Sequence, residues 1–195
     1  MSAVPDLLAD FVALERLLEA QPEGMNVEIV RGVWLLAPRP RFRHGRSAVR
    51  LASLLESGPG ADGQDGTRSD WVFVIEPEIR SELAFSRLIP DLAGWRRSTG
   101  GWPGPDESVI ELVPDWVAEV VSPSTEAVDR GRKREAYGLM GVAWYWIVDP
   151  EKRTVDVFTN VRGRMVPERS LGADDPLSAP PFPPLGGPVA TLFPD

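Results

Sequence analysis

The chain has 195 residues, and 21 lysines and arginines against 29 aspartates and glutamates give a net charge of 21 − 29 = −8. This length predicts a single domain over residues 1–195, since domains usually have about 100–200 residues. The absence of cysteine excludes disulfide bonds, zinc–thiolate sites, iron–sulfur clusters and a thiol nucleophile. A single histidine, His44, excludes a multi-histidine metal centre, whereas carboxylate sites for a hard cation remain open.

The N-terminal residues lack the basic and apolar regions of a secretory signal. No apolar run in the sequence approaches the roughly 20 residues that a membrane-spanning helix needs. We therefore expect a cytoplasmic protein with no membrane partner.

Hydrophobic periodicity and turn residues predict alternating helices and strands. In chain order, we expect a helix (6–20), a hairpin (25–30 and 33–37), a helix (43–56), a glycine-rich loop (58–68) and three strands (71–78, 87–95 and 115–121). There follow a helix (125–140), a second hairpin (143–149 and 154–159) and a proline-rich tail (170–195) that we expect to wrap the surface in extended form. This order predicts one α/β or α+β domain built on a mixed β-sheet.

Two acidic residues, Asp91 and Glu119, lie in otherwise apolar predicted strands. Because side chains alternate along a strand, Glu119 shares a face with Val117 and Val121, which predicts a buried carboxylate. Such a group is costly unless it is paired, protonated or bound to a metal. Two acids on neighbouring strands could supply oxygen ligands to one Mg²⁺ ion. The alternative is that Asp91 caps a turn after Pro90 and that Glu119 pairs with an arginine.

The helix that follows the Glu119 strand carries Lys133 and Tyr137, four residues apart and therefore on one face. That face can fold back over the carboxylates, where a lysine can polarise a phosphate or orient an attacking water. The neighbouring basic residues 130–134 are otherwise expected to form a solvated helix surface. Lys133 differs from them because 19 of the 21 basic residues in the chain are arginines.

Several motifs together resemble the Uma2 family, a family of unknown function assigned to the PD-(D/E)XK nuclease superfamily. The most specific are PDWVAEVVSPST, the spaced Lys133 and Tyr137, and GVAWYWIVDPEKRTVDVF. Upstream, the segment around Glu28 resembles the family's early hairpin, His44 its histidine at the next helix, and Pro90 with Asp91 its PD element. The resemblance covers about residues 10–160.

The resemblance implies a restriction-endonuclease-like core, a mixed sheet flanked by helices, with an N-terminal helix and β-hairpin. Asp91 and Glu119 would be ligands of Mg²⁺ or Mn²⁺, with Glu28 as a third acid. Lys133 would be the catalytic lysine, and Tyr137 a neighbour that supports it. The superfamily pattern expects a lysine two residues after the second acid, where this chain has Val121, so Lys133 would act from the following helix.

The distribution of charge bears on whether the protein binds nucleic acid. A net charge of −8 argues against a general nucleic-acid binder, but residues 39–50 contain five arginines and no acid. Local positive potential there and at residues 130–134 could hold phosphates, or the arginines could pair with the surplus acids. We take His44, Arg43, Arg46 and Arg130 as candidate substrate-binding residues, and a purely structural role for His44 stays open.

The first functional hypothesis is a Mg²⁺-dependent endonuclease that hydrolyses phosphodiester bonds of DNA, with in-line attack by water and Lys133 stabilising charge on the phosphate. A homodimer with twofold symmetry would let two sites cut two strands. The alternative is a non-catalytic nucleic-acid-binding or protein-interaction module that retains the nuclease fold. A third hypothesis is a carboxylate–metal hydrolase that acts on a substrate other than nucleic acid.

Overall fold

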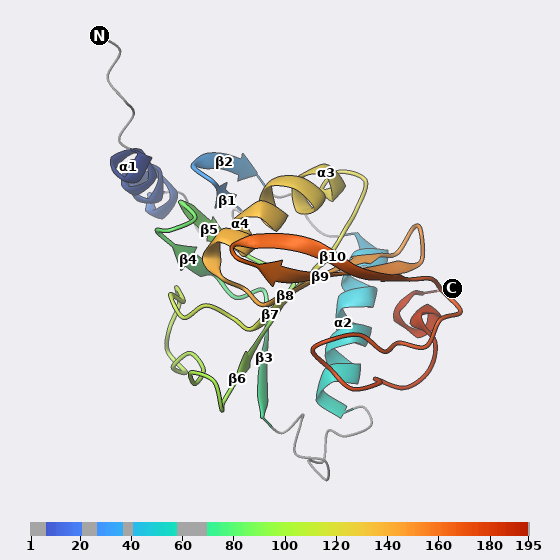
Figure 1. Cartoon of the computed structure of the whole chain (residues 1–195). Coiled ribbons are helices and arrows are strands. Elements are labelled where there is room, and N and C mark those ends of the chain that lie inside the picture. The colour runs from blue at the N-terminus through green and yellow to red at the C-terminus, as the bar shows by residue number, and fades with distance from the viewer. Residues whose placement is uncertain (1–6, 21–26, 37–40, 58–69, 195) are drawn as a thin grey trace.

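Two β-sheets and their helices make up the computed structural model, which describes residues 7–20, 27–36, 41–57 and 70–194 (Figure 1). The larger sheet has six strands in the order β10-β9-β8-β7-β6-β3, and the smaller has four in the order β2-β1-β5-β4. Among the paired strands of these residues, only β7 and β8 run parallel. The strands are β1 (Val27–Val30), β2 (Val33–Leu36), β3 (Trp71–Ile75), β4 (Ile79–Ser81), β5 (Ser86–Leu88), β6 (Leu92–Arg96), β7 (Trp116–Val120), β8 (Trp144–Asp149), β9 (Thr154–Val161) and β10 (Arg164–Leu171).

The three predicted helical segments lie where the periodicity placed them, and a short 3₁₀ helix lies in the tail that was expected to be extended. The helices are α1 (Leu7–Glu19), α2 (Phe42–Ser57), α3 (Glu126–Val128), the π-helical turn η1 (Asp129–Lys133), α4 (Arg134–Met140) and the 3₁₀ helix η2 (Val189–Leu192). The predicted helix over residues 125–140 is thus one helical segment with a π-turn at its centre. None of the helices in the described part of the chain is long and apolar enough to cross a bilayer.

The mixed α+β architecture is the predicted one, but one predicted strand is shorter than expected and another is divided. The first stops at Ile75, because Glu76 has a positive φ of 49° and Pro77 cannot donate a backbone hydrogen bond. The second is split at Pro90 into β5 and β6. Strand β5 pairs with β4, which lies beyond the expected strand and was not predicted, and β5 also pairs with β1 to complete the smaller sheet. One sheet was expected, and two are present.

Strand β10 was not predicted, because it is an edge strand that contains Pro167 and an irregularity in register between Pro167 and Arg169. The β1–β2 hairpin does turn at the predicted pair, Arg31 and Gly32, whose φ values of 52° and 70° suit a two-residue hairpin turn. The predicted loop over residues 58–68 lies outside the described residues, as do the first residues of the predicted hairpin.

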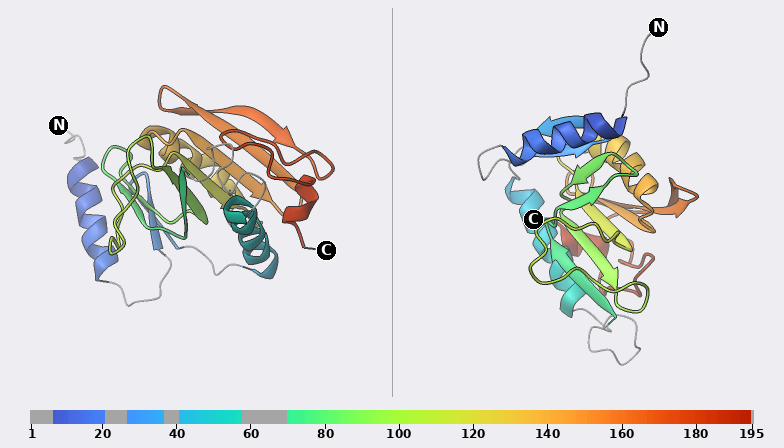
Figure 2. Two further views of the ribbon diagram at one scale, coloured as in Figure 1. Left: turned by 90° about the horizontal axis from the view of Figure 1, so that it is seen from below. Right: turned by 90° about the vertical axis from the view of Figure 1, so that its left-hand side faces the viewer.

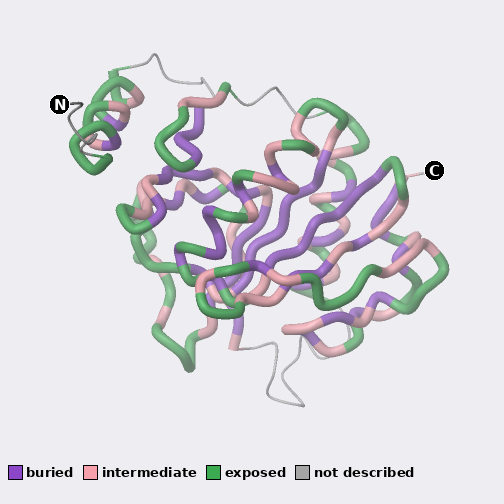
Figure 3. Tube along the Cα trace, turned by 45° about the horizontal axis from the view of Figure 1, so that its top comes forward, coloured by how far each residue is buried: buried purple, intermediate pink, exposed green. Residues whose placement is uncertain are grey.

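The larger sheet is covered on both faces (Figure 2). Alternate side chains of β7 belong to two different hydrophobic cores. Trp116, Ala118 and Val120 face the core beneath α2. Val117, and Val121 just after the strand, face the core beneath α4. The smaller sheet and α1 lie on one side of the molecule, and α2 with the C-terminal segment lies on the other (Figure 1). In Figure 3 the continuous buried trace follows the central strands, where all residues of β7 are buried.

The C-terminal segment does not simply wrap the surface, as the sequence suggested, but completes the core beneath α2. Its buried apolar side chains are Leu177, Ala179, Phe182, Leu185, Val189, Leu192 and Phe193. The ring of Phe182 lies among the rings of Trp71, Phe73, Trp116 and Trp146, at centroid distances of 4.9, 5.6, 5.2 and 5.5 Å. The indole N–H of Trp146 donates to the carbonyl of Pro180 at 2.8 Å. The tail is therefore held by both packing and hydrogen bonding.

A close backbone approach sets the position of α4. A Cβ atom at Gly138 would lie 2.8 Å from the carbonyl oxygen of Gly163, so a larger residue would push α4 away from the β9–β10 turn. The side-chain amide of Asn160 donates to the carbonyls of Gly138 and Val142 at 2.8 and 2.9 Å. Helix α4 is thereby fastened to the sheet one turn after the lysine of the predicted site.

We expect the Phe182→Ala substitution to lower the free energy of unfolding by about 3–5 kcal/mol, because it empties the centre of the aromatic cluster. Denaturant titration followed by tryptophan fluorescence measures this change. The matched control is Phe42→Ala, since the Phe42 side chain is 79% exposed, and its effect should stay within about 0.5 kcal/mol. Equal effects of the two substitutions would show that the tail does not contribute to the core.

Candidate functional site

A cavity of about 550 Å³ lies between the two sheets. The smaller sheet contributes Glu28 from β1, and the larger sheet contributes Asp91, just before β6, and Glu119 from β7. Helix α2 contributes His44, and the π-turn contributes Asp129 and Lys133. Five separate parts of the chain therefore converge on one hollow.

The ammonium group of Lys133 lies at the centre of the acidic residues. Its Nζ atom is 2.9 Å from Oε2 of Glu28, 3.0 Å from Oε1 of Glu119 and 3.7 Å from Oδ1 of Asp129. The lysine side chain is only 7% exposed, so these ion pairs are shielded from solvent. The helix after the Glu119 strand thus folds back over the carboxylate, as the sequence suggested.

Two buried tyrosines hold this arrangement. The hydroxyl of Tyr137 donates to Oε1 of Glu119 at 2.6 Å, and the hydroxyl of Tyr145 donates to the backbone carbonyl of Asp129 at 3.1 Å. Burial is the main cause that raises the pKa of both tyrosines well above the usual range, and the negative charge of Glu119 is the second cause. Both hydroxyls therefore stay protonated and act as donors.

Asp91 is anchored by two partners. Its Oδ2 atom accepts the backbone N–H of Val120 at 2.6 Å and lies 3.1 Å from Nε2 of His44. Burial lowers the pKa of His44, but the hydrogen bond and the charge of Asp91 outweigh this and raise it above its ordinary value. The Nδ1 atom of His44 is buried and has no hydrogen-bond partner among the described residues.

Glu28 links the smaller sheet to the larger one. Its Oε1 atom accepts the backbone N–H of Ile89 at 2.7 Å, while its Oε2 atom pairs with Lys133. Both carboxylate oxygens of Glu28 are therefore already engaged.

Comparison with protein families decides the assignment of the chain. A family model described as "Putative restriction endonuclease" matches residues 8–190. The chain belongs to the Uma2 family. The match runs past residue 160, where the sequence resemblance had ended, and includes most of the C-terminal segment that completes the core.

A solved structure supports the fold of this Uma2 chain. It is the crystal structure of "a putative nuclease belonging to DUF820" from Anabaena variabilis, with a TM-score of 0.72 and 18% sequence identity. The alignment covers 92% of this chain and 96% of the Anabaena chain. The fold is restriction-endonuclease-like, as the sequence resemblance implied. No curated protein matched the sequence.

The electrostatics of the Uma2 site follow from the burial of three acids around one lysine, with Asp91 in the same cavity. Burial raises the pKa of Glu119 well above its usual value, because the attraction of Lys133 does not offset it and Asp129, Asp91 and Glu28 add to it. Burial likewise raises the pKa of Asp129 to about 6, against the attraction of Lys133. Burial lowers the pKa of Lys133, but the surrounding carboxylates raise it well above 10.5, so the ammonium stays charged.

The donor chemistry of the cavity fits a divalent cation. Four carboxylates against one ammonium leave a surplus of negative charge when all are ionised, and Mg²⁺ prefers such oxygen ligands. Asp91 and Glu119 can both contribute, since Mg²⁺ commonly takes only one or two carboxylates and keeps several waters. Within the described residues, however, no three acidic or histidine side chains are arranged as a ready-made metal centre. Glu28 in particular is occupied by Lys133 and Ile89.

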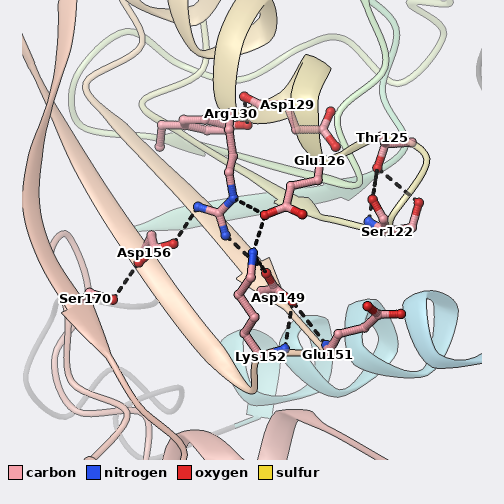
Figure 4. A network of polar contacts seen from close by, with 11 residues as sticks. Ser122, Thr125, Glu126, Asp129, Arg130, Asp149, Glu151, Lys152, Asp156 and Ser170 are labelled. Carbon is pink, nitrogen blue, oxygen red and sulfur yellow. Dashed lines mark hydrogen bonds and ion pairs between the residues drawn. The ribbon is translucent and has the colours of Figure 1, made fainter.

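Arg130, a candidate substrate-binding residue, does not line the cavity, and Figure 4 shows its guanidinium group among acidic side chains. Its guanidinium group is 2.9 Å from Glu126, 3.2 Å from Asp149 and 2.6 Å from Asp156. The contacts with Asp149 and Asp156 fasten the π-turn to β8 and β9. Arg130 thus supports the helix that carries the site, and the structure does not bring it to His44. The other two candidates, Arg43 and Arg46, are exposed on α2.

Asp129 is the site residue that sequence reasoning missed. It precedes Lys133 by four residues and Tyr137 by eight, so helical spacing already places all three on one face. Asp129 is followed at once by four basic residues within residues 130–134, which make the segment resemble a basic helix surface.

The raised pKa of Asp129 predicts a specific dependence of stability on pH. Its carboxyl group has a pKa of 3.8 when unperturbed and about 6 in the folded protein, so the folded state binds the proton more tightly. Stability is therefore lost as pH rises from about 4 to about 6 and changes little above that range.

We expect the stability of Asp129→Asn, relative to wild type, to rise across this interval by roughly 3 kcal/mol, the equivalent of the pKa change. Denaturant titrations of both proteins at several pH values, in buffers with a chelator, measure the difference. A difference that does not vary with pH would mean that the Asp129 carboxyl is not perturbed.

Proposed function

We propose that this Uma2 protein is a divalent-metal-dependent endonuclease that hydrolyses phosphodiester bonds in DNA. The observation that carries the proposal is the buried ammonium of Lys133, 3.0 Å from Glu119, in a cavity that also contains Asp91. Membership of a family described as "Putative restriction endonuclease", together with the restriction-endonuclease-like fold, supports the same reaction class.

In this proposal Asp91 and Glu119 hold Mg²⁺ or Mn²⁺. When bound, the cation would activate water and offset the charge of the phosphate. The backbone N–H of Val120 and His44 fix the Asp91 carboxylate, and Tyr137 fixes that of Glu119. Glu28 is proposed as a third acid that positions Lys133, while its role as a direct metal ligand stays a prediction.

Lys133 would donate a hydrogen bond from its ammonium group to a phosphate oxygen on which negative charge develops. Its raised pKa keeps this group positively charged, and the helical face it shares with Tyr137 and Asp129 directs it into the cavity. A preorganised donor in a site shielded from water is the arrangement that stabilises such charge best. The lysine can therefore act from the following helix although Val121 occupies the usual position.

The substrate would approach the cavity from the side of α2, which contributes His44 and the exposed Arg43 and Arg46. Arg130 pairs with three acids, so we do not include it among the proposed DNA contacts. A homodimer that cuts both strands, a single domain over the whole chain and a cytoplasmic location stay predictions.

The second candidate function is a binding module that retains the nuclease fold without turnover. The observation that favours it is the engagement of Lys133 by both Glu28 and Glu119, which leaves the ammonium fully paired. The two functions differ in what Glu119 is needed for: cleavage in the first, and only the stability of the fold in the second.

Calorimetric titration with Mn²⁺ tests the metal site without any assumption about DNA sequence. We expect one ion to bind per chain, and Asp91→Ala or Glu119→Ala to weaken binding at least tenfold, because each removes a proposed ligand. Glu168→Ala is the matched control, since Glu168 is an exposed acid on β10. Thermal melting of each variant confirms that it is folded. Equal affinity in all four proteins would refute the assignment of the ligands.

We expect Lys133→Met to reduce the rate of DNA cleavage by about 10²–10³-fold, the usual effect of removing one donor to developing charge. Cleavage of supercoiled plasmid in Mn²⁺ measures the rate. Lys152→Met is the matched control, because the chain's other lysine is 57% exposed and pairs with Glu126 and Asp149 outside the cavity.

Glu119→Gln separates the two candidate functions. An endonuclease would lose cleavage but still bind DNA, whereas wild-type protein that binds DNA in Mn²⁺ and never cuts it would support the binding module.

A further inference from the structure

Helix α2 presents to solvent a stripe of apolar and polar side chains that includes one arginine, and two more exposed arginines, Arg41 and Arg43, lie beside its first end. Phe42, Arg46, Val49 and Ser53 follow one another at spacings of four, three and four residues, and all are exposed. Phe42 is 79% exposed and Val49 54% exposed. The opposite face of the helix is buried in the core, so this stripe is not used to hold the fold together.

The arginines in and beside this stripe are not neutralised by the surplus acids of the described residues. Arg41, Arg43 and Arg46 form no ion pair with any described residue, whereas Arg80 and Arg87 each pair with two or more glutamates. Helix α2 contains a single acidic residue, Glu56, in its last turn. A patch of unpaired positive charge in a chain with a net charge of −8 indicates an anionic partner.

The position of these arginines along the helix strengthens this conclusion. The first turns of a helix carry the positive end of its dipole, where a cation is unfavourable and an anion is stabilised. Arg43 and Arg46 lie in these turns, and the first turn contains no acid. The arrangement lowers stability in the free protein and becomes favourable when phosphates bind.

The stripe connects two cavities. At its first end, Arg41 and His44 line the cavity of the candidate site. At its other end, a second cavity of about 630 Å³ lies between α2 and the C-terminal helix η2, and its lining includes Arg46, Arg50 and Arg153. Arg50 donates to the carbonyls of Thr191 and Phe193, and Arg153 lies over the ring of Phe193. The C-terminal segment thus fixes two of the arginines in place.

We propose that this face of α2 binds the phosphate backbone of DNA to one side of the bond that is cut. Arg43 and Arg50 are seven residues apart, or about 10 Å along the helix. That length matches about three base-pair steps of duplex DNA. The inference rests on the proposed function and extends it. A strand whose scissile phosphate lies in the site cavity continues along α2 and ends at the cavity lined by Arg153.

The first test measures the salt dependence of DNA binding in a Glu119→Gln background, which prevents cleavage. The binding of a fluorescently labelled, mixed-sequence duplex is followed by anisotropy between about 50 and 200 mM NaCl. Adding Arg43→Ala and Arg46→Ala should weaken binding about 10- to 100-fold and reduce the slope of log affinity against log salt by about 0.9 for each lost phosphate contact.

The matched control replaces two other exposed arginines, Arg16→Ala on α1 and Arg164→Ala on β10, in the same background. It changes the net charge equally but leaves α2 intact, so affinity and slope should stay close to those of the parent.

A second test locates the DNA directly. Because the chain contains no cysteine, Ser53→Cys provides a single attachment point beside the second cavity for a photoactivated crosslinker. DNA should crosslink to this position and not to Glu168→Cys on β10.

The outcomes separate the two proposals. Loss of affinity and slope only in the α2 variant, with crosslinking from position 53, supports the phosphate-binding face. Equal binding by both double variants, or equal crosslinking from positions 53 and 168, overturns the α2 assignment and leaves the endonuclease proposal standing. No binding by the parent even at 50 mM salt, where nonspecific DNA binding is strong, overturns both proposals.

Discussion

The ammonium group of Lys133 lies between two carboxylates that come from different sheets. Glu28 belongs to the smaller sheet and Glu119 to the larger one, and the lysine itself comes from the helical connection between the parallel strands β7 and β8. One buried charge thereby joins three parts of the fold. Removing any of the three residues would leave an uncompensated charge in the interior, which typically costs about 3–5 kcal/mol. The chemistry of the cavity and the docking of the smaller sheet therefore depend on the same contacts.

The π-turn that carries Lys133 is held from both sides. On its outer side, Arg130 binds acids of β8 and β9, and on its inner side Tyr145 binds the carbonyl of Asp129. π-Turns inside helices are rare and are found frequently at functional sites. Within this turn Asp129 and Lys133 line the cavity, whereas Arg130, between them in sequence, does not line it and pairs with Glu126, Asp149 and Asp156.

The parts of the site that sequence could predict are those defined by local spacing. Strand alternation placed Glu119 on a buried face, and helical spacing brought Lys133 and Tyr137 together above it. The partners of Arg130 could not be predicted, because Asp149 and Asp156 reach it only through the pairing of β8 with β9. The second sheet was missed for a similar reason: β5 lies beside β1 through a contact between distant segments that no local pattern records. The burial of Phe182 was also unexpected, because its proline-rich surroundings resemble a surface segment.

The position of Phe182 has a consequence for how the chain reaches its native state. Its ring contacts that of Trp71, which is 182 − 71 = 111 residues earlier in the chain. Contacts between such distant residues require a large loop to close, and proteins rich in them fold slowly. During synthesis the aromatic cluster cannot be completed until Phe182 has emerged, although the hairpins and helices before it can already fold. Until then, Trp71, Trp116 and Trp146 lack the ring that packs among them in the native state.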